Sequence, residues 1–129
     1  MPGRTVVSDR FNDASMAYQG YGRKLGTETV RALDRIVCGP TQPDLTLLLD
    51  LAPGVALRRA QGRELRQNSR HGRFEAEGLK FHQRVRRGYL AIARQDPKRI
   101  KVVSADRPVN EVQSEIRKLV GEFLAHRRD

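Results

Sequence analysis

The polar side chains that follow residues 5–7 are the part of the sequence best suited to chemistry. Asp9 offers a carboxylate that can help to hold a metal ion, and Arg10 offers a planar guanidinium that grips phosphate oxygens in pairs. Three more hydrogen-bonding side chains follow shortly, at helical spacing: Ser15, Tyr18 and Gln19. Together they predict a binding site for a phosphorylated ligand and its metal ion.

Two predicted elements would position this site. Residues 5–7 are β-branched and too few for a helix, so they predict a short strand that ends at Asp9 and Arg10. In open α/β sheets, ligands bind beyond the carboxyl ends of the strands, where this pair would lie. Asn12 or Asp13 can cap a following helix, whose spacing would place the three polar side chains on one face close to Arg10.

These residues resemble a known signature. Asp9-Arg10-Phe11 and the run from Ser15 to Gly20 are similar to the Asp-Arg-aromatic and Ala-Tyr-Gln-Gly motifs of thymidylate kinases, which phosphorylate dTMP with ATP. The similarity covers nearly the whole chain and continues through residues 43–50, 73–75 and 81–89. One departure is large. That family begins with a phosphate-binding glycine loop, whereas no Gly-x-x-x-x-Gly-Lys-Ser/Thr occurs in these 129 residues.

The resemblance implies a role for each matching residue. Asp9 would help to hold Mg²⁺, and Arg10 would bind the phosphate of dTMP. Ser15 and Gln19 would lie near the base, and Tyr18 would crowd the sugar so that a 2′-hydroxyl fits poorly. Glu75 matches a family position close to the nucleotide and its metal ion. Phe74 would also contact the nucleotide, but it stands where other members can have tyrosine, so it lacks that hydroxyl.

The positive charge of the chain gathers in one segment. The net charge is +10, and residues 57–101 contain 14 of the 25 Lys and Arg residues but only 4 of the 15 Asp and Glu residues. Residues 62–72 are polar, basic and bounded by glycines, which predicts a mobile flap within a flexible basic lid at about residues 58–73. By the resemblance, arginines of this lid would close over the phosphates, with one acting as an arginine finger: Arg59, Arg63, Arg66 and Arg70.

The rest of the chain alternates helical and extended patterns. Helices are expected near residues 12–21, from Thr27 as the cap to 37, from 53 to about 60, from about 74 to 96, and after Pro108. Strands are expected at 44–51 and 100–104. This order indicates a single α/β domain over residues 1–129, in three layers, with a parallel sheet covered by helices on both faces. The resemblance makes it similar to a P-loop nucleotide kinase that lacks its first two strands.

Several other readings remain open at this stage. Tyr18 could simply pack in the core, Asp9 and Arg10 could form only an ion pair, and Asp50 could cap a helix or meet a ligand. Another nucleoside-monophosphate kinase is one alternative function. A basic nucleic-acid-binding protein is a second, which the lack of aromatic residues among the arginines makes less favoured.

The remaining expectations concern activity and surroundings. Without a glycine loop, residues 1–129 alone are predicted to be an inactive or incomplete kinase. The resemblance implies a homodimer in the full-length enzyme. The single cysteine, Cys38, permits no intrachain disulfide, and the most apolar stretch, residues 45–52, is too short to span a membrane. A cytoplasmic location is therefore expected.

Overall fold

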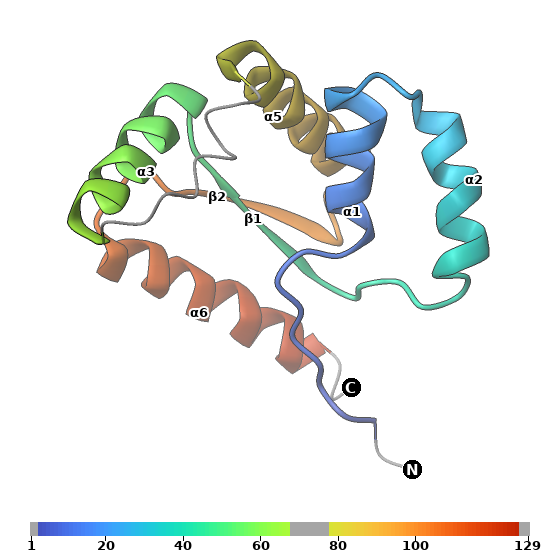
Figure 1. The fold of residues 1–129 in the computed structure, drawn as a ribbon. Helices are drawn as coiled ribbons and strands as arrows, with labels where there is room; N and C mark the ends of the chain where they lie inside the picture. Colours follow the sequence, from blue (N-terminus) through green and yellow to red (C-terminus); the bar gives the residue numbers. More distant parts are fainter. Residues whose placement is uncertain (1–2, 68–77, 127–129) are drawn as a thin grey trace.

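The structure, a computed structural model, describes residues 3–67 and 78–126 (Figure 1). The chain begins with α1 (Asn12–Ser15), which continues directly into a rarer π-helical segment, η1 (Met16–Gly22). In the remaining elements helices and strands are interspersed, as the sequence predicted for an α/β protein. They are α2 (Thr27–Val37), β1 (Thr46–Asp50), α3 (Pro53–Gln67), α5 (Gly78–Gln95), β2 (Ile100–Ser104) and α6 (Val109–His126).

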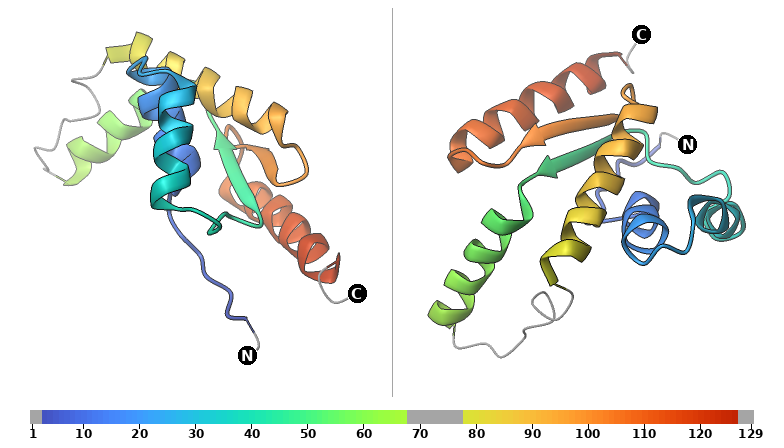
Figure 2. Two further views of the ribbon diagram at one scale, coloured as in Figure 1. Left: turned by 90° about the vertical axis from the view of Figure 1, so that its right-hand side faces the viewer. Right: turned by 90° about the horizontal axis from the view of Figure 1, so that it is seen from above.

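The two strands form a parallel pair with helices on both faces. Thr46 lies opposite Ile100, and Asp50 lies opposite Ser104 at the other end. The chain between them passes through α3 and α5, since parallel strands require a long crossover. α5 packs against one face of the sheet and α6 against the other, as Figures 1 and 2 show. The predicted arrangement of a parallel sheet between helical layers is therefore confirmed.

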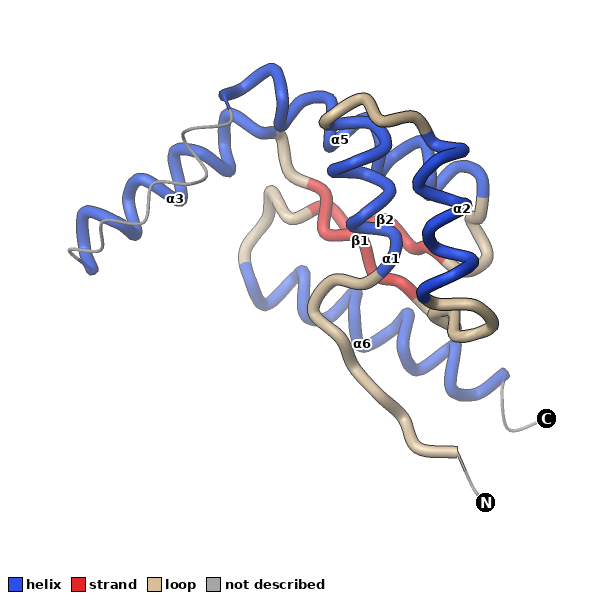
Figure 3. The backbone as a smooth tube through the Cα atoms, turned by 45° about the vertical axis from the view of Figure 1, so that its right-hand side comes forward, coloured by secondary structure: helices blue, strands red, loops and turns tan. Residues whose placement is uncertain are grey.

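The predicted opening strand is not present. Residues 3–8 are an irregular segment that runs away from the sheet (Figure 3), and Val6 and Val7 are 84% and 92% exposed. A strand needs a neighbour for its backbone hydrogen bonds, and in the described part of the chain β1 pairs only with β2. The β-branched residue types at positions 5–7 favour extended backbone but cannot supply that neighbour.

Two helices have different bounds from those expected. α3 continues through Gly62 to Gln67, so the first part of the predicted flap is helical, because Ala, Leu, Arg, Gln and Glu in this stretch favour a helix despite one glycine. α5 is described from Gly78, and the expected start near Phe74 lies outside the described residues.

The start of α2 also differs from expectation, because Gly26 occupies the cap position of this helix with a φ of 89°. Thr27, the expected cap, is instead the first helical residue, and no side chain caps the helix. Along its predicted apolar stripe only Val30 is buried, whereas Leu33 and Val37 are exposed. One side of α2 is therefore left uncovered by the described chain.

The core lies where η1 crosses α5. Ala17 is fully buried against Phe81 and Val85, and the cluster extends to Ile92 and Ile100. Two glycines allow the helices to approach closely. A Cβ at Gly88 would lie 2.7 Å from the Tyr21 ring, and a Cβ at Gly22 would lie 2.8 Å from Val85. This close crossing holds the tyrosines of η1 against α5.

Candidate functional site

Arg10 occupies an unusual backbone conformation just before α1. Its φ of 66° lies in the left-handed region, where residues other than glycine are uncommon. The hydroxyl of Ser8 donates a 2.7 Å hydrogen bond to the Arg10 carbonyl and supports this turn. Left-handed residues of this kind cluster at ligand sites, where the surrounding structure holds them in place.

The Arg10 side chain meets Tyr18, as required for a shared site. Its guanidinium carbon lies 5.2 Å from the centre of the Tyr18 ring, within the range of a cation–π interaction. Its Nη2 is 3.5 Å from the Tyr18 hydroxyl, at the long limit of a hydrogen bond. No ion pair joins Asp9 to Arg10 in the described structure, so the purely structural ion pair considered above is not formed.

Two aromatic side chains of α5 also contact the Tyr18 ring. Phe81 and Tyr89 lie edge-on to it, with ring centres 6.1 Å and 6.3 Å away. The packing role considered for Tyr18 is therefore confirmed, and its role beside a sugar stays a prediction. Its ring packs against the core, and it also meets the guanidinium. Burial, with a contribution from Tyr18, raises the pKa of Tyr89 to about 12, so this phenol is neutral at physiological pH.

The other predicted site residues are not drawn into the same contacts. Ser15 and Gln19 are exposed on the helix that carries Tyr18, and no hydrogen bond joins their side chains to Arg10. The Gln19 carbonyl accepts a 3.0 Å hydrogen bond from the amide of Leu25 and so helps to end η1. Their role near a base remains a prediction.

The structure does not bring the described lid arginines to Arg10. α3, which carries Arg59 and Arg63, lies on the far side of α5 from η1 (Figure 2). Arg59 donates to the Ala105 carbonyl at 3.1 Å and lies 3.4 Å from the Asp106 carboxylate, while Arg63 is exposed. The structure does not describe the side chain of Arg66. Three further predicted site residues lie outside the described residues: Arg70, Phe74 and Glu75.

Asp50, at the carboxyl end of β1, forms a two-pronged ion pair with Arg86 of α5. The two nitrogen–oxygen distances are 2.8 Å and 2.9 Å. This hydrogen bonding raises the pKa of Arg86 and ties the sheet to α5. Asp50 is engaged by Arg86 in this structure, and its predicted contact with a ligand stays a prediction. Arg86 was not among the predicted site residues, because its partner lies 36 residues away in sequence.

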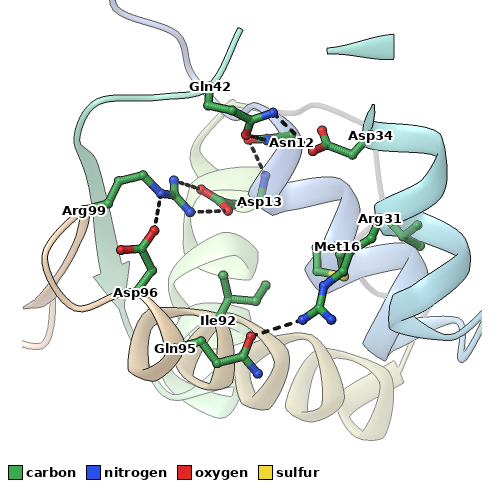
Figure 4. Close-up of a pocket in the computed structure, with 11 residues that line it drawn as sticks. Asn12, Asp13, Met16, Arg31, Asp34, Gln42, Ile92, Gln95, Asp96 and Arg99 are labelled. Carbon is green, nitrogen blue, oxygen red and sulfur yellow. Dashed lines mark hydrogen bonds and ion pairs between the residues drawn. The ribbon is translucent and has the colours of Figure 1, made fainter. Parts of the chain in front are cut away.

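A second polar cluster lies at the opposite, amino-terminal edge of the sheet (Figure 4). Arg99 makes two hydrogen bonds to Asp13, of 2.7 Å and 3.0 Å, and one of 2.8 Å to Asp96. Asp13 also accepts a hydrogen bond from Thr46, the first residue of β1. These bonds raise the pKa of Arg99, whose charge is fully compensated. Asp13 thus anchors α1 to the sheet, and neither it nor Asn12 forms the predicted N-terminal cap.

A pocket of about 240 Å³ adjoins this cluster, between α1, α2 and α5. Met16, Val30 and Ile92 form its apolar part. Hydrogen bonds tie its polar side chains to one another, Arg31 to Gln95 and Asp34 to Gln42 (Figure 4). Most charged groups of this pocket form hydrogen bonds or ion pairs with other groups of the protein. We therefore assign the pocket a structural role and place the candidate site at Arg10 and Tyr18.

The described residues contain neither a cluster of metal ligands nor a membrane-spanning helix. No group of three or more His, Cys, Asp or Glu side chains in residues 3–67 and 78–126 is arranged to hold a metal ion. Asp9 is exposed and pairs with no cation among the described residues, and Glu75, its expected partner, is outside the described part. No described helix is long and apolar enough to cross a membrane.

Comparison with known proteins agrees with the signature around Arg10 and Tyr18. The family model for thymidylate kinase matches residues 1–116. The thymidylate kinase of Desulfovibrio desulfuricans is 43% identical over 127 residues, which cover 97% of this chain and 58% of the relative. That of Maridesulfovibrio salexigens is 46% identical over 124 residues, covering 95% and 57%. The chain therefore spans little more than half the length of these relatives.

The similarity is also high over a shorter region. The thymidylate kinase of Syntrophotalea carbinolica is 48% identical over 111 residues, covering 85% of this chain and 51% of the relative. The family-model match includes the segment that carries Arg10 and Tyr18, both strands and α5. On this evidence the chain belongs to the thymidylate kinase family.

Proposed function

We propose that this chain binds dTMP and supplies the monophosphate side of a kinase that transfers a phosphoryl group from ATP to form dTDP. The observation that carries the proposal is the state of Arg10. Its guanidinium rests on the Tyr18 ring, and among the described residues no carboxylate pairs with it. Its forked donors therefore remain available for phosphate oxygens.

The neighbouring residues extend this proposal. Tyr18 would lie against the sugar, and Ser15 and Gln19 would lie near the base. Asp9 would help to hold Mg²⁺, and its carboxylate, which is exposed and pairs with no cation in the described part of the chain, suits the oxygen ligands and water shell that this ion prefers. Glu75 would assist it, and Phe74 would lie beside the nucleotide. The metal ion would neutralise charge on the transferred phosphoryl group.

The lid supplies the second part of the proposal. Residues 1–129 would form one partial kinase domain in which residues 58–73 close over the phosphates. Support comes from the arginines of this segment: Arg59, Arg63 and Arg66 belong to α3, and Arg70 follows in the sequence. The contact of Arg59 with Asp106 is mostly exposed, so it holds that side chain only weakly. To reach a bound nucleotide, Arg59 would leave this contact and its hydrogen bond to the Ala105 carbonyl.

Turnover by these 129 residues alone is predicted to be very low. The sequence contains no glycine loop, and the backbone N–H groups of such a loop hold the phosphates of ATP in P-loop kinases. Binding and catalysis should therefore separate in this chain. Kinase turnover at ordinary rates by the purified 129-residue chain would contradict this prediction.

Calorimetric titration of the purified chain tests the binding step. We expect dTMP to bind and thymidine, which lacks the phosphate, to bind much more weakly. Arg10→Met, which removes the charge but keeps the length, should weaken dTMP binding about 10- to 100-fold, because a hydrogen bond to a charged group contributes roughly 1.5–3 kcal/mol. Equal binding of AMP and dTMP would instead favour another nucleoside-monophosphate kinase.

We also propose a homodimer that works in the cytoplasm. Support for the dimer comes from α2, where three apolar side chains are exposed at helical spacing: Leu33, Ile36 and Val37. Support for the compartment comes from the single cysteine, Cys38, which is free in the structure.

A further inference from the structure

Tyr89 lies on α5 and was not among the predicted site residues. It reaches the candidate site through its contact with Tyr18. The planes of the two rings meet at 84°, with their centres 6.3 Å apart. Edge-to-face pairs of this kind are favourable beyond their buried area, and they favour one mutual orientation. The ring that Tyr89 orients is the same ring that carries the Arg10 guanidinium.

We propose that Tyr89 is a positioning residue for Arg10, and this inference rests on the proposed function of Arg10 in binding the phosphate of dTMP. The Tyr89 ring fixes the orientation of Tyr18, and the Tyr18 face then fixes the guanidinium. Tyr89 itself touches no phosphate in this scheme.

Arg10 needs such support because its own segment provides little. Residues 3–11 are exposed, and Arg10 is tied to its surroundings by the turn at Ser8 and the contact with Tyr18. A free arginine side chain populates many rotamers, and part of this conformational entropy would be lost on binding a ligand. Holding the guanidinium on an oriented ring before the ligand arrives lowers that loss.

Phe81 also borders Tyr18, but its situation differs. It is buried in the core, and the guanidinium groups of Arg23 and Arg84 lie near its ring. Tyr89 is only partly buried, and its hydroxyl lies in the electrostatic field of Arg10 and Asp9. Because this hydroxyl stays neutral, Tyr89 acts on Arg10 through its ring and not as a counter-ion.

Two substitutions separate the ring from the hydroxyl. Tyr89→Leu removes the ring, and we expect dTMP affinity measured by calorimetry to fall about 5- to 10-fold, the loss that corresponds to a cation–π contact of roughly 1 kcal/mol. Tyr89→Phe keeps the ring and should retain dTMP affinity within about twofold. If the leucine variant does not fold, Tyr89→Met takes its place, since a flexible side chain fills irregular gaps.

Tyr21→Leu is the matched control. Tyr21 comes from the same helix as Tyr18 and packs against Gly88 in the same crossing, but no contact joins it to Arg10. Its loss should lower the thermal midpoint as much as the loss of Tyr89 while leaving dTMP affinity unchanged. Equal weakening of dTMP binding by Tyr21→Leu and Tyr89→Leu would overturn the positioning role.

A second measurement needs no nucleotide. In the free protein the Nε–H resonance of Arg10 should be shifted upfield by the Tyr18 ring current. Tyr89→Leu should abolish this shift, and Tyr89→Phe and Tyr21→Leu should keep it. Failure of the wild-type chain to bind dTMP would contradict the proposed function alone. An unchanged Arg10 resonance in Tyr89→Leu would overturn the positioning role whatever the dTMP result.

Discussion

Two arginines of this chain are held in opposite ways. Arg99 donates hydrogen bonds to Asp13, Asp96 and Thr46, so its charge is compensated inside the protein. Arg10 rests on an aromatic face, and no described carboxylate pairs with it. An arginine of the first kind holds elements together, and one of the second kind remains able to bind an anion. This contrast separates the structural edge of the sheet from the candidate binding site.

Arg99→Met should destabilise the fold. The side chains of Arg99 and Asp13 are only 21% and 15% exposed, so removing one partner leaves a largely buried charge. We expect the free energy of unfolding in urea to fall by about 2–4 kcal/mol, near the lower end for fully buried pairs. Arg86→Met, which breaks a more exposed pair with Asp50, is the comparison and should cost less. An equal or smaller loss for Arg99→Met would contradict the anchoring role.

Alkaline pH should reveal the burial of Tyr89. Its pKa in the folded chain is raised to about 12 from an ordinary value of 10.0. A raised pKa means that this group contributes stability that is fully present below about pH 10 and is lost as the pH rises through about 12. Absorbance of the ionised phenol should show one tyrosine titrating last. Tyr89→Phe should remove that late step and flatten the loss of stability in this pH window.

The elements differ in how far sequence reasoning could predict them. β1, β2, α5 and α6 were predicted because their patterns are local, a run of leucines or a stripe at helical spacing. The prediction of a strand at residues 5–7 was wrong, because strand pairing depends on a neighbouring strand that no local pattern reveals. The extension of α3 past Gly62 was missed because one glycine weakens a helix by only about 1 kcal/mol, which strong helix formers offset.

Only the part of the candidate site that lies within one local motif could be predicted from the sequence. The motif identified Arg10 and Tyr18, and the structure places them in contact. Tyr89, Arg86 and Arg99 could not be assigned, since each acts through a partner 36 to 86 residues away in sequence or across a helix crossing. A single sequence gives the type of such a side chain but not its partner. The roles of Asp9, Ser15, Gln19 and the lid arginines stay predictions.

The crossing of η1 and α5 makes Gly88 a sensitive position. A Cβ there would lie 2.7 Å from both Cβ and Cγ of Tyr21, far inside normal contact. Gly88→Ala should therefore lower the free energy of unfolding by about 1–3 kcal/mol, the usual cost of overpacking. Gly121→Ala on α6 is the control, because nothing lies within 4 Å of its added Cβ. That change should stabilise the helix by about 0.5–1 kcal/mol. A neutral Gly88→Ala would show that the helices can separate freely.

At the scale of the whole molecule, several apolar side chains of the described residues are left uncovered. Val6 and Val7 are exposed near the chain start, and Leu49 of β1 is 52% exposed even though leucine runs in parallel strands are normally covered on both faces. Val109 and Leu124 of α6 are 77% and 44% exposed, and the outer side of α2 is uncovered as well. The described core therefore stabilises the helix crossing better than it covers the sheet.

The outer side of α2 leads to a prediction about assembly. Ile36 and Val37 are 81% and 79% exposed, and Leu33 lies one helical turn before them, so the three form one apolar strip. Strips of this kind mark protein contacts, and a second copy of the chain can cover the strip symmetrically. Light scattering after size-exclusion chromatography should give a dimer at micromolar concentration, and Ile36→Lys should convert it to a monomer without lowering the thermal midpoint of that monomer. Leu124→Lys on α6, where the side chain is 44% exposed, should leave the dimer intact. A wild-type monomer, or equal disruption by both lysines, would show that α2 does not form the contact.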